Sequence, residues 1–110
     1  MNTSAIKELP LVAVVILNWN GEAFLKKFLP SVLASTYGNK EIIVADNCSS
    51  DGSLAMLAEE FPEVKIIKNK ANEGFAKGYN LALANVIADY FVLLNSDVEV
   101  TKNWIEPIIQ

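Results

Sequence analysis

Two kinds of side chain are missing from this 110-residue sequence: it contains no histidine and no arginine, so all nine of its basic residues are lysines. Without histidine there is no Ser-His-Asp or Cys-His nucleophile pair and no histidine-ligated zinc site. Without arginine, no guanidinium can bind a phosphate or a carboxylate through two parallel hydrogen bonds. The single cysteine excludes an internal disulfide and any metal site built from several thiolates.

The charge balance is acidic, with thirteen Asp and Glu residues and a net charge of −4. Nucleic-acid binding is not favoured, because it needs a basic surface that these totals do not supply. Carboxylate chemistry and metal binding through oxygen ligands stay open. The longest apolar run, residues 11–17, is about a third of the roughly 20 residues that a membrane-spanning helix needs. A lone cysteine suits the reducing cytoplasm, where we expect this protein to be.

Apolar runs of strand length alternate with amphipathic stretches of helix length along the chain. Four of these runs predict strands, because they are rich in β-branched residues and are apolar at nearly every position, as in strands buried on both faces. They cover residues 11–17, 42–45, 64–67 and 90–94. The alternation predicts right-handed βαβ units and therefore an α/β fold of three layers, a mostly parallel sheet with helices on both faces.

Apolar residues at helical spacing occupy the three segments between these strands. The stripes consist of Phe24, Phe28 and Val32, flanked by Leu25, Leu29 and Leu33, of Leu54, Leu57, Ala58 and Phe61, and of Phe75, Tyr79, Leu83 and Val86. Pro30 is expected to kink the first helix. A short fourth helix is predicted to begin at Thr101, its N-cap, and to run through Trp104 and Ile105.

Each predicted strand is followed by a loop rich in Asn, Asp, Ser and Gly. Ligands bind outside the carboxyl ends of the strands in an open parallel sheet, so these loops are the candidate site. Many of their residues are what any turn needs: Asn20 is predicted to cap the first helix, and Ser50 or Asp51 the second. Gly74 precedes a helix whose backbone could approach an anionic ligand, but the sequence has neither a Walker loop nor a dinucleotide fingerprint.

Asp46, Asp97 and Glu99 are the loop residues with the clearest chemical potential. Asp46 directly follows a strand, so its carboxylate could accept a hydrogen bond from a pyrimidine ring or a ribose hydroxyl; a purely structural role is equally open. Asp97 and Glu99 would point the same way on an extended backbone and could hold a hard cation such as Mg²⁺ or Mn²⁺. A solvated acidic loop is the competing interpretation. Trp19 lies in a crevice loop and could stack on a base.

Four segments, taken together, resemble the family 2 glycosyltransferases, and more narrowly the rhamnosyltransferase-like branch of bacterial polysaccharide assembly. They are residues 14–20 (VVILNWN), 44–53 (VADNCSSDGS), 72–80 (NEGFAKGYN) and 93–98 (LLNSDV). Any one of them is weak evidence, but four in the family's order and spacing are specific. The resemblance implies a GT-A fold, whose Rossmann-like amino-terminal half binds a nucleotide-sugar and a divalent metal.

The resemblance also implies roles around the nucleotide. Asp46 would contact the nucleobase, Trp19 would lie beside the base or ribose, and Asn72 and Gly74 would help to enclose the nucleoside. The predicted nucleotide-sugar-binding residues are Leu17, Trp19, Asp46, Asn72, Gly74, Asn95 and Ser96.

The family's D-x-D metal motif aligns with Asn95, Ser96 and Asp97. Its last Asp, here Asp97, would ligate the Mn²⁺ or Mg²⁺ that bridges the diphosphate, which removes the need for arginines. Asn95 stands where the family has an aspartate, and an amide is a poorer ligand for a hard metal. Glu99 is therefore predicted as a second metal ligand.

Members of the family continue past this motif into an acceptor-binding half that carries an acidic catalytic base. We therefore predict that residues 1–10 are an amino-terminal extension and that residues 11–110 are a nucleotide-sugar-binding domain without that half.

The predicted parent is an inverting enzyme that moves a sugar from a UDP-, dTDP- or GDP-linked donor to a glycan or lipid-linked acceptor. It would act in the cytoplasm, at the inner face of the membrane. The 110-residue chain would be inactive and would self-associate through apolar surface that the second half covers. A non-catalytic nucleotide-binding or protein-interaction α/β domain is the alternative.

Overall fold

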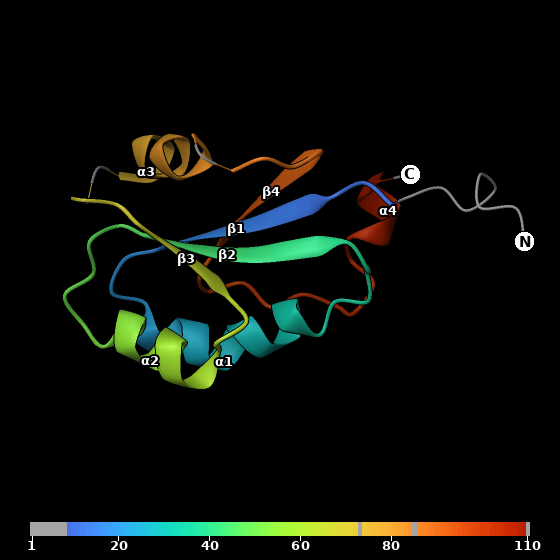
Figure 1. Cartoon of the computed structure of the whole chain (residues 1–110). Helices are drawn as coiled ribbons and strands as arrows, with labels where there is room; N and C mark the ends of the chain where they lie inside the picture. Colours follow the sequence, from blue (N-terminus) through green and yellow to red (C-terminus); the bar gives the residue numbers. More distant parts are fainter. Residues whose placement is uncertain (1–8, 73, 85, 110) are drawn as a thin grey trace, which may run out of the picture.

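The computed structural model describes residues 9–72, 74–84 and 86–109, in which four strands form a single sheet (Figure 1). The strands are β1 (Val12–Asn18), β2 (Lys40–Asp46), β3 (Lys65–Lys68) and β4 (Tyr90–Asn95). Their order is β3-β2-β1-β4, and every neighbouring pair is parallel. Most of the predicted amino-terminal extension, residues 1–8, lies outside the described residues.

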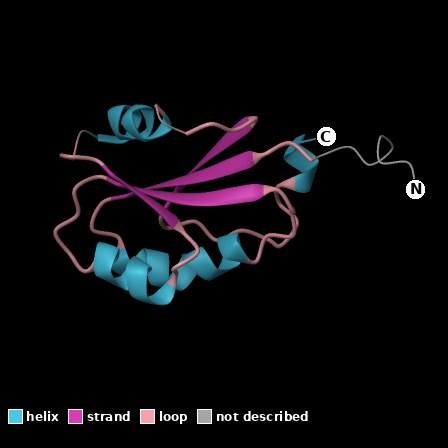
Figure 2. Cartoon of the chain, viewed as in Figure 1, coloured by secondary structure: helices cyan, strands magenta, loops and turns pink. Residues whose placement is uncertain are grey.

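Helices cover both faces of this sheet (Figure 2). Helices α1 (Glu22–Leu33) and α2 (Ser53–Glu60) lie on one face, and α3 (Gly74–Leu83) lies on the other, while the short α4 (Glu106–Ile109) follows the last strand (Figure 1). The predicted three-layer α/β fold is confirmed. Within the described part of the chain, no helix is long and apolar enough to cross a bilayer.

Strand β1 separates two apolar cores, because all seven of its residues are buried. Its side chains alternate between the two faces, as strand geometry requires. Val12, Val14 and Ile16 pack into the core beneath α1 and α2, whereas Ala13, Val15 and Leu17 pack into the core beneath α3. The uninterrupted apolar run in the sequence therefore reflects burial on both faces of the central layer.

The predicted apolar face of α1 is partly wrong. Leu25, Leu29 and Val32 are buried against the sheet, while Phe24 is 51% exposed. The predicted stripe that starts at Phe24 and the flanking one that starts at Leu25 are offset by one residue, about 100° around a helix. Both are apolar, so periodicity alone does not tell which one faces the core. Phe24 instead stacks on Phe28, with 6.4 Å between the ring centroids.

Helices α2 and α3 follow their predictions more closely. Leu57 is fully buried as predicted, but Met56 and Ser53 join it while Ala58 is exposed. On α3, the predicted Tyr79 is buried. Leu83 and Val86 belong to the same core, and the side chain of Phe75 lies outside the described residues.

The fourth helix begins at Glu106, five residues later than predicted. The segment before it forms turns, because the carbonyl of Lys102 accepts a hydrogen bond from the N–H of Thr36 (2.7 Å). The indole N–H of Trp104 donates to the hydroxyl of Ser35 (2.6 Å), and Ile105 is completely buried. Contacts with the end of α1 thus outweigh the local helix signal at Thr101.

Substitutions of Phe24 and Leu25, which are adjacent in α1, test directly which face of the helix is buried. Leu25→Ala should lower the free energy of unfolding by about 2–5 kcal/mol, because it leaves a cavity in a closed core. Phe24→Ala should change it by only about 0.5 kcal/mol, since the ring is half exposed. Urea denaturation followed by circular dichroism measures both values, and an equal loss in the two variants would contradict the packing described above.

Candidate functional site

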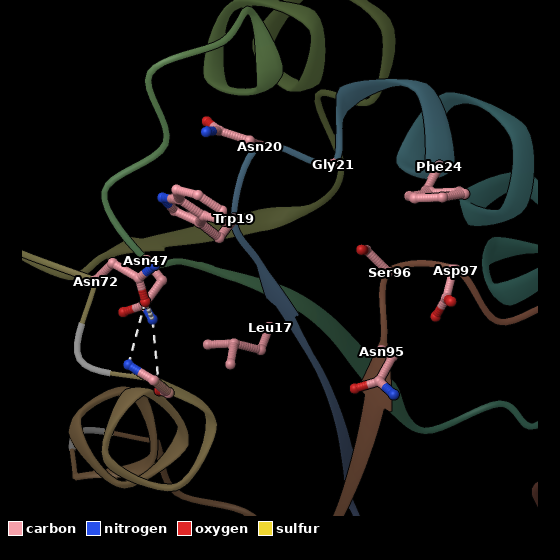
Figure 3. Close-up of a pocket in the computed structure, with 11 residues that line it drawn as sticks. Leu17, Trp19, Asn20, Gly21, Phe24, Asn47, Asn72, Asn95, Ser96 and Asp97 are labelled. Atoms are coloured by element: carbon pink, nitrogen blue, oxygen red, sulfur yellow. Dashed lines mark hydrogen bonds between the residues drawn. The ribbon is translucent and has the colours of Figure 1, made fainter.

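A pocket of about 400 Å³ opens at the carboxyl ends of the parallel strands (Figure 3). Parallel register brings these ends together, because Leu17 pairs with Asn95 and Asn18 pairs with Asp46. The lining residues are Leu17, Trp19, Asn20, Gly21, Phe24, Asn47, Asn72, Gly74, Asn95, Ser96 and Asp97. Seven of the nine predicted site residues are among them, and Asp46 and Glu99 are not.

One end of the pocket is built from Trp19 and a chain of amides (Figure 3). The side chain of Asn69 donates to Asn47 Oδ1 (3.1 Å), and Asn47 Nδ2 donates to Asn72 Oδ1 (2.7 Å). Asn72 Oδ1 also accepts from the N–H of Gly74 (3.1 Å). Two donors therefore hold the oxygen of Asn72, which leaves its amino group available as a donor. Trp19, 55% exposed, presents an apolar ring at the same end.

Gly74 and Gly21 allow the backbone around the pocket to take its shape. Gly74 has φ of 81°, in the left-handed region that side chains disfavour. A Cβ on Gly21 would lie 2.5 Å from Asn18 Oδ1 and 2.9 Å from Ser96 Oγ. Any larger residue at position 21 would therefore have to displace the side chains of Asn18 and Ser96.

The opposite end of the pocket carries its acid. Asn95 is the last residue of β4, and Asp97 lies beyond it on the Phe24 side (Figure 3). Asp97 is exposed, and it is the one carboxylate among the described lining residues, none of which is cationic. The hydroxyl of Tyr79 donates to the carbonyl of Leu94 (2.5 Å) and so ties the end of β4 to α3. Burial raises the pKa of Tyr79, which keeps this hydroxyl protonated as a donor.

Glu99 is not brought to the pocket with Asp97. The backbone turns at Ser96 and Asp97 instead of staying extended, so the geometry on which the predicted carboxylate pair depended is absent. Glu99 is exposed and does not line the pocket. In the described part of the chain, no group of three or more Asp, Glu or Cys side chains is placed to hold a metal ion.

Asp46 does not line the pocket and is only 1% exposed. Its Oδ1 accepts hydrogen bonds from Asn18 Nδ2 (3.0 Å) and from the hydroxyl of Ser49 (2.7 Å), and its Oδ2 accepts from the N–H of Ser49 (2.9 Å). A buried carboxylate needs such donors to offset the loss of water. These contacts fix the turn that contains Cys48, whose φ is 66°. In this geometry Asp46 supports the loop and presents no face to the pocket.

The first two loops are joined to each other by hydrogen bonds. Asn20 does not cap α1 as predicted, since the cap residue is Gly21, which makes no side-chain cap hydrogen bond. Asn20 Oδ1 instead accepts from the N–H groups of Ser50 (2.7 Å) and Asp51 (3.2 Å). Likewise the cap position of α2 is Gly52, although Asp51 accepts from the next N–H, that of Ser53 (2.9 Å).

Asp51 also serves α1, because its second oxygen accepts the N–H of Glu22 (3.1 Å). In the opposite direction, the Glu22 carboxylate accepts a hydrogen bond from the N–H of Gly52 (3.1 Å). The amino end of α1 is therefore held by an acid of the loop before α2, and the amino end of α2 by an acid in the first turn of α1.

Four lining residues were not predicted: Asn20, Gly21, Phe24 and Asn47. Asn20 and Gly21 lie in the loop after the first predicted strand, where Asn20 was assigned to helix capping and Gly21 was given no role of its own, and Phe24 was assigned to an apolar helical stripe. Asn47 had a usable signal, because it follows Asp46 at a strand end. Successive residues of a strand point in opposite directions, so the side chain of Asn47 lines the pocket while that of Asp46 does not.

The Asp51 contacts predict a pH dependence of stability. Partial burial opposes ionisation, but hydrogen bonds from the hydroxyl and N–H of Ser53 and from the N–H of Glu22 outweigh it, so the pKa of the Asp51 carboxyl lies below its ordinary value. Such a group stabilises the fold fully above its unfolded pKa, about 4, and this contribution disappears as the pH falls through the lower folded value.

The unfolding free energies of the native protein and Asp51→Asn should therefore differ more at pH 7 than at pH 3. Denaturant titrations at the two pH values measure the difference. Glu63→Gln, an exposed acid between α2 and β3, is the matched control and should show little change in either condition. A difference for Asp51→Asn that does not depend on pH would contradict the assignment.

Comparison with known proteins connects this fold to sugar transfer. The sequence profile described as Glycosyl transferase family 2 matches residues 13–110. A glycosyltransferase of Haemophilus influenzae is 35% identical over 103 residues, which cover 91% of this chain and 32% of that protein. Glycosyltransferase GlyA of Streptococcus pneumoniae is 28% identical over 100 residues, covering 88% of this chain and 14% of that protein. The chain thus spans a third or less of the length of these relatives.

Solved structures share the architecture. TarS of S. aureus (residues 1–349) in complex with UDP-GlcNAc superposes with a TM-score of 0.79 at 22% identity, over 88% of this chain and 29% of that one. The mannosyltransferase PcManGT of Pyrobaculum calidifontis, in complex with GDP-Man and Mn²⁺, gives 0.75 at 22% identity, over 84% and 29%. At this identity the likeness shows the fold, which is that of GT-A glycosyltransferases.

Proposed function

Because this chain belongs to glycosyl transferase family 2, we propose that its pocket binds the nucleotide-sugar donor of an inverting, metal-assisted glycosyltransferase. The observation that carries the proposal is the convergence of seven predicted residues on one pocket at the carboxyl ends of the strands. This is where open parallel sheets bind their ligands. The two solved relatives that hold UDP-GlcNAc and GDP-Man support a nucleotide-sugar as the ligand class.

The amide end of the pocket suits the nucleoside. Trp19 offers a face on which a base can stack, and Leu17 supplies apolar contact beside it. The amino group of Asn72, left available by the bonds to its oxygen, can donate to a carbonyl of the base or to a ribose hydroxyl. A direct contact between Asp46 and the base stays a prediction from the sequence, and its contacts favour support of the loop instead.

The acidic end suits the diphosphate and a hard divalent cation. Asp97, the amide oxygen of Asn95 and the hydroxyl of Ser96 are all oxygen donors, and one carboxylate with phosphates and water is a common magnesium site. No lysine is among the described lining residues, so the pocket itself offers no positive charge to a diphosphate. A bound Mn²⁺ or Mg²⁺ would neutralise the departing nucleoside diphosphate. That PcManGT is seen with Mn²⁺ supports this choice.

The remaining parts of the proposal concern the whole enzyme. The four motifs favour the rhamnosyltransferase-like branch, a glycan or lipid-linked acceptor and action at the cytoplasmic face of a membrane. Within the described pocket, Asp97 is the one carboxylate, and metal binding would occupy it. No acid then remains there to deprotonate an acceptor hydroxyl, so we assign no catalytic base to this chain and propose that it supplies the donor-binding part.

Donor binding is tested by calorimetric titration with UDP, dTDP and GDP, each with Mn²⁺ or with EDTA. One of the three should bind at least about tenfold more tightly with Mn²⁺, a difference of about 1.4 kcal/mol. Asp97→Asn should abolish the effect of Mn²⁺, because an amide is a poor ligand for a hard cation.

Glu99→Gln is the matched control, since Glu99 lies outside the pocket, and it should keep the effect of Mn²⁺. If Asp97→Asn retained the effect of Mn²⁺, or if Glu99→Gln lost it, the assignment of the metal site to Asp97 would be wrong. Failure of all three nucleotides to bind would favour a non-catalytic interaction domain.

Transfer activity is a separate prediction. The 110-residue chain should release no nucleoside diphosphate in response to an acceptor, because no acid of the described pocket is free to act as base. A coupled assay with nucleotide-sugars and simple glycan or lipid-linked acceptors measures this release. Acceptor-dependent turnover by the chain alone would show that it contains the whole catalytic apparatus.

A further inference from the structure

Asn18, the last residue of β1, carries a buried oxygen that has no hydrogen-bond partner. The residue is completely buried, and its amino group donates to Asp46 Oδ1 (3.0 Å) and to the hydroxyl of Ser49 (3.2 Å). A carboxylate only accepts hydrogen bonds, so the amide cannot be reversed and Asn18 Oδ1 has to face away from Asp46. No described residue donates to this oxygen. A buried acceptor without a donor is unfavourable, so a donor brought to it stabilises the arrangement that results.

The hydroxyl of Ser96 borders the same small space as Asn18 Oδ1. A Cβ on Gly21 would lie 2.5 Å from Asn18 Oδ1 and 2.9 Å from Ser96 Oγ, so the two oxygens are neighbours and no side chain at position 21 comes between them. The Ser96 hydroxyl forms no hydrogen bond with a described residue, and Ser96 is partly exposed, so its side chain can rotate. An unpaired donor therefore lies beside an unpaired buried acceptor.

We propose that Ser96 donates a hydrogen bond to Asn18 Oδ1 when the nucleotide and its metal are bound, and that Ser96 is thereby a positioning residue for Asp97. This inference rests on the donor-binding function proposed above. Ser96 directly precedes Asp97 in the turn after β4 (Figure 3), and a metal held by Asp97 orders that turn. Fixing the hydroxyl of an ordered turn costs less conformational entropy, so metal binding and this hydrogen bond strengthen each other.

The hydrogen bond also decides what the Ser96 hydroxyl presents to the ligand. A hydroxyl has one proton to donate and two lone pairs. When the proton is donated to Asn18, the oxygen presents only lone pairs to the pocket, and these suit a cation and not a phosphate oxygen. The bond further extends the contacts of Asp46, through Asn18, to the loop after β4. The turn that carries Asp97 is then fixed to the same buried acid as the loops around the nucleoside.

The side-chain carbonyl carbon of Asn18 reports this hydrogen bond, because its ¹³C resonance moves downfield when the oxygen accepts one. Addition of Mg²⁺ with UDP, dTDP or GDP, whichever binds in the calorimetric titration, should produce this shift in the native chain. Ser96→Thr, which keeps the hydroxyl, should show the shift as well, and Ser96→Ala should not. Ser50→Ala is the matched control, because it removes an exposed hydroxyl outside the pocket, and it should keep the shift.

Calorimetry on the same variants separates positioning from a structural role. Ser96→Ala should weaken nucleotide binding about three- to tenfold with Mg²⁺, the effect of one hydrogen bond. It should leave binding with EDTA and the free energy of unfolding unchanged, because the bond is absent from the free chain. A shift that persists in Ser96→Ala, or no shift in a native chain that binds the nucleotide, overturns the inference alone. Failure of all three nucleotides to bind overturns the donor-binding function with it.

Discussion

The shape of the pocket depends on a carboxylate that does not touch it. Asp46 ends β2 inside the protein, and its charge is tolerable there because Asn18 and the backbone and hydroxyl of Ser49 donate to it. These bonds join the ends of β1 and β2 and set the turn after Asp46. The same turn aims Asn47 at the pocket, and Asn47 in turn holds Asn72. One buried acid thus orders three of the loops that form the site.

The sheet itself was predictable, because full burial leaves a simple signature. The run of residues 11–17 contains no polar residue and is rich in β-branched residues, as in a strand enclosed on both faces. The loops at the carboxyl ends followed from the parallel topology, and this is why Trp19 and Asp97 could be assigned to the candidate site from position alone, whereas Asn72 was named through the family resemblance; all three line the pocket. The positions of the strands and of the loops that follow them can both be predicted from short stretches of sequence, without knowledge of the contacts between distant segments.

What the sequence did not reveal depends on contacts between distant segments. Phe24 and Leu25 are equally apolar, and only the position of the sheet decides that Leu25 is inside. Asn20 is a residue type that commonly caps helices, but its side-chain oxygen accepts hydrogen bonds from the N–H groups of Ser50 and Asp51, about thirty residues further along the chain. The Asp97–Glu99 pair assumed an extended backbone, which the turn after β4 removes. In each case a tertiary partner changes the outcome of a correct local propensity.

The central claim is that a nucleoside diphosphate and its metal occupy this pocket, and Mn²⁺ allows both to be located at once. Amide spectra of the ¹⁵N-labelled chain, recorded with UDP, dTDP or GDP and substoichiometric Mn²⁺, report distance from the metal through paramagnetic broadening. The account predicts that broadening is strongest at Asn95, Ser96, Asp97 and Gly21, with shift changes at Trp19 and Asn72 on nucleotide binding. Broadening centred elsewhere on the chain, or the same broadening with and without nucleotide, would contradict it.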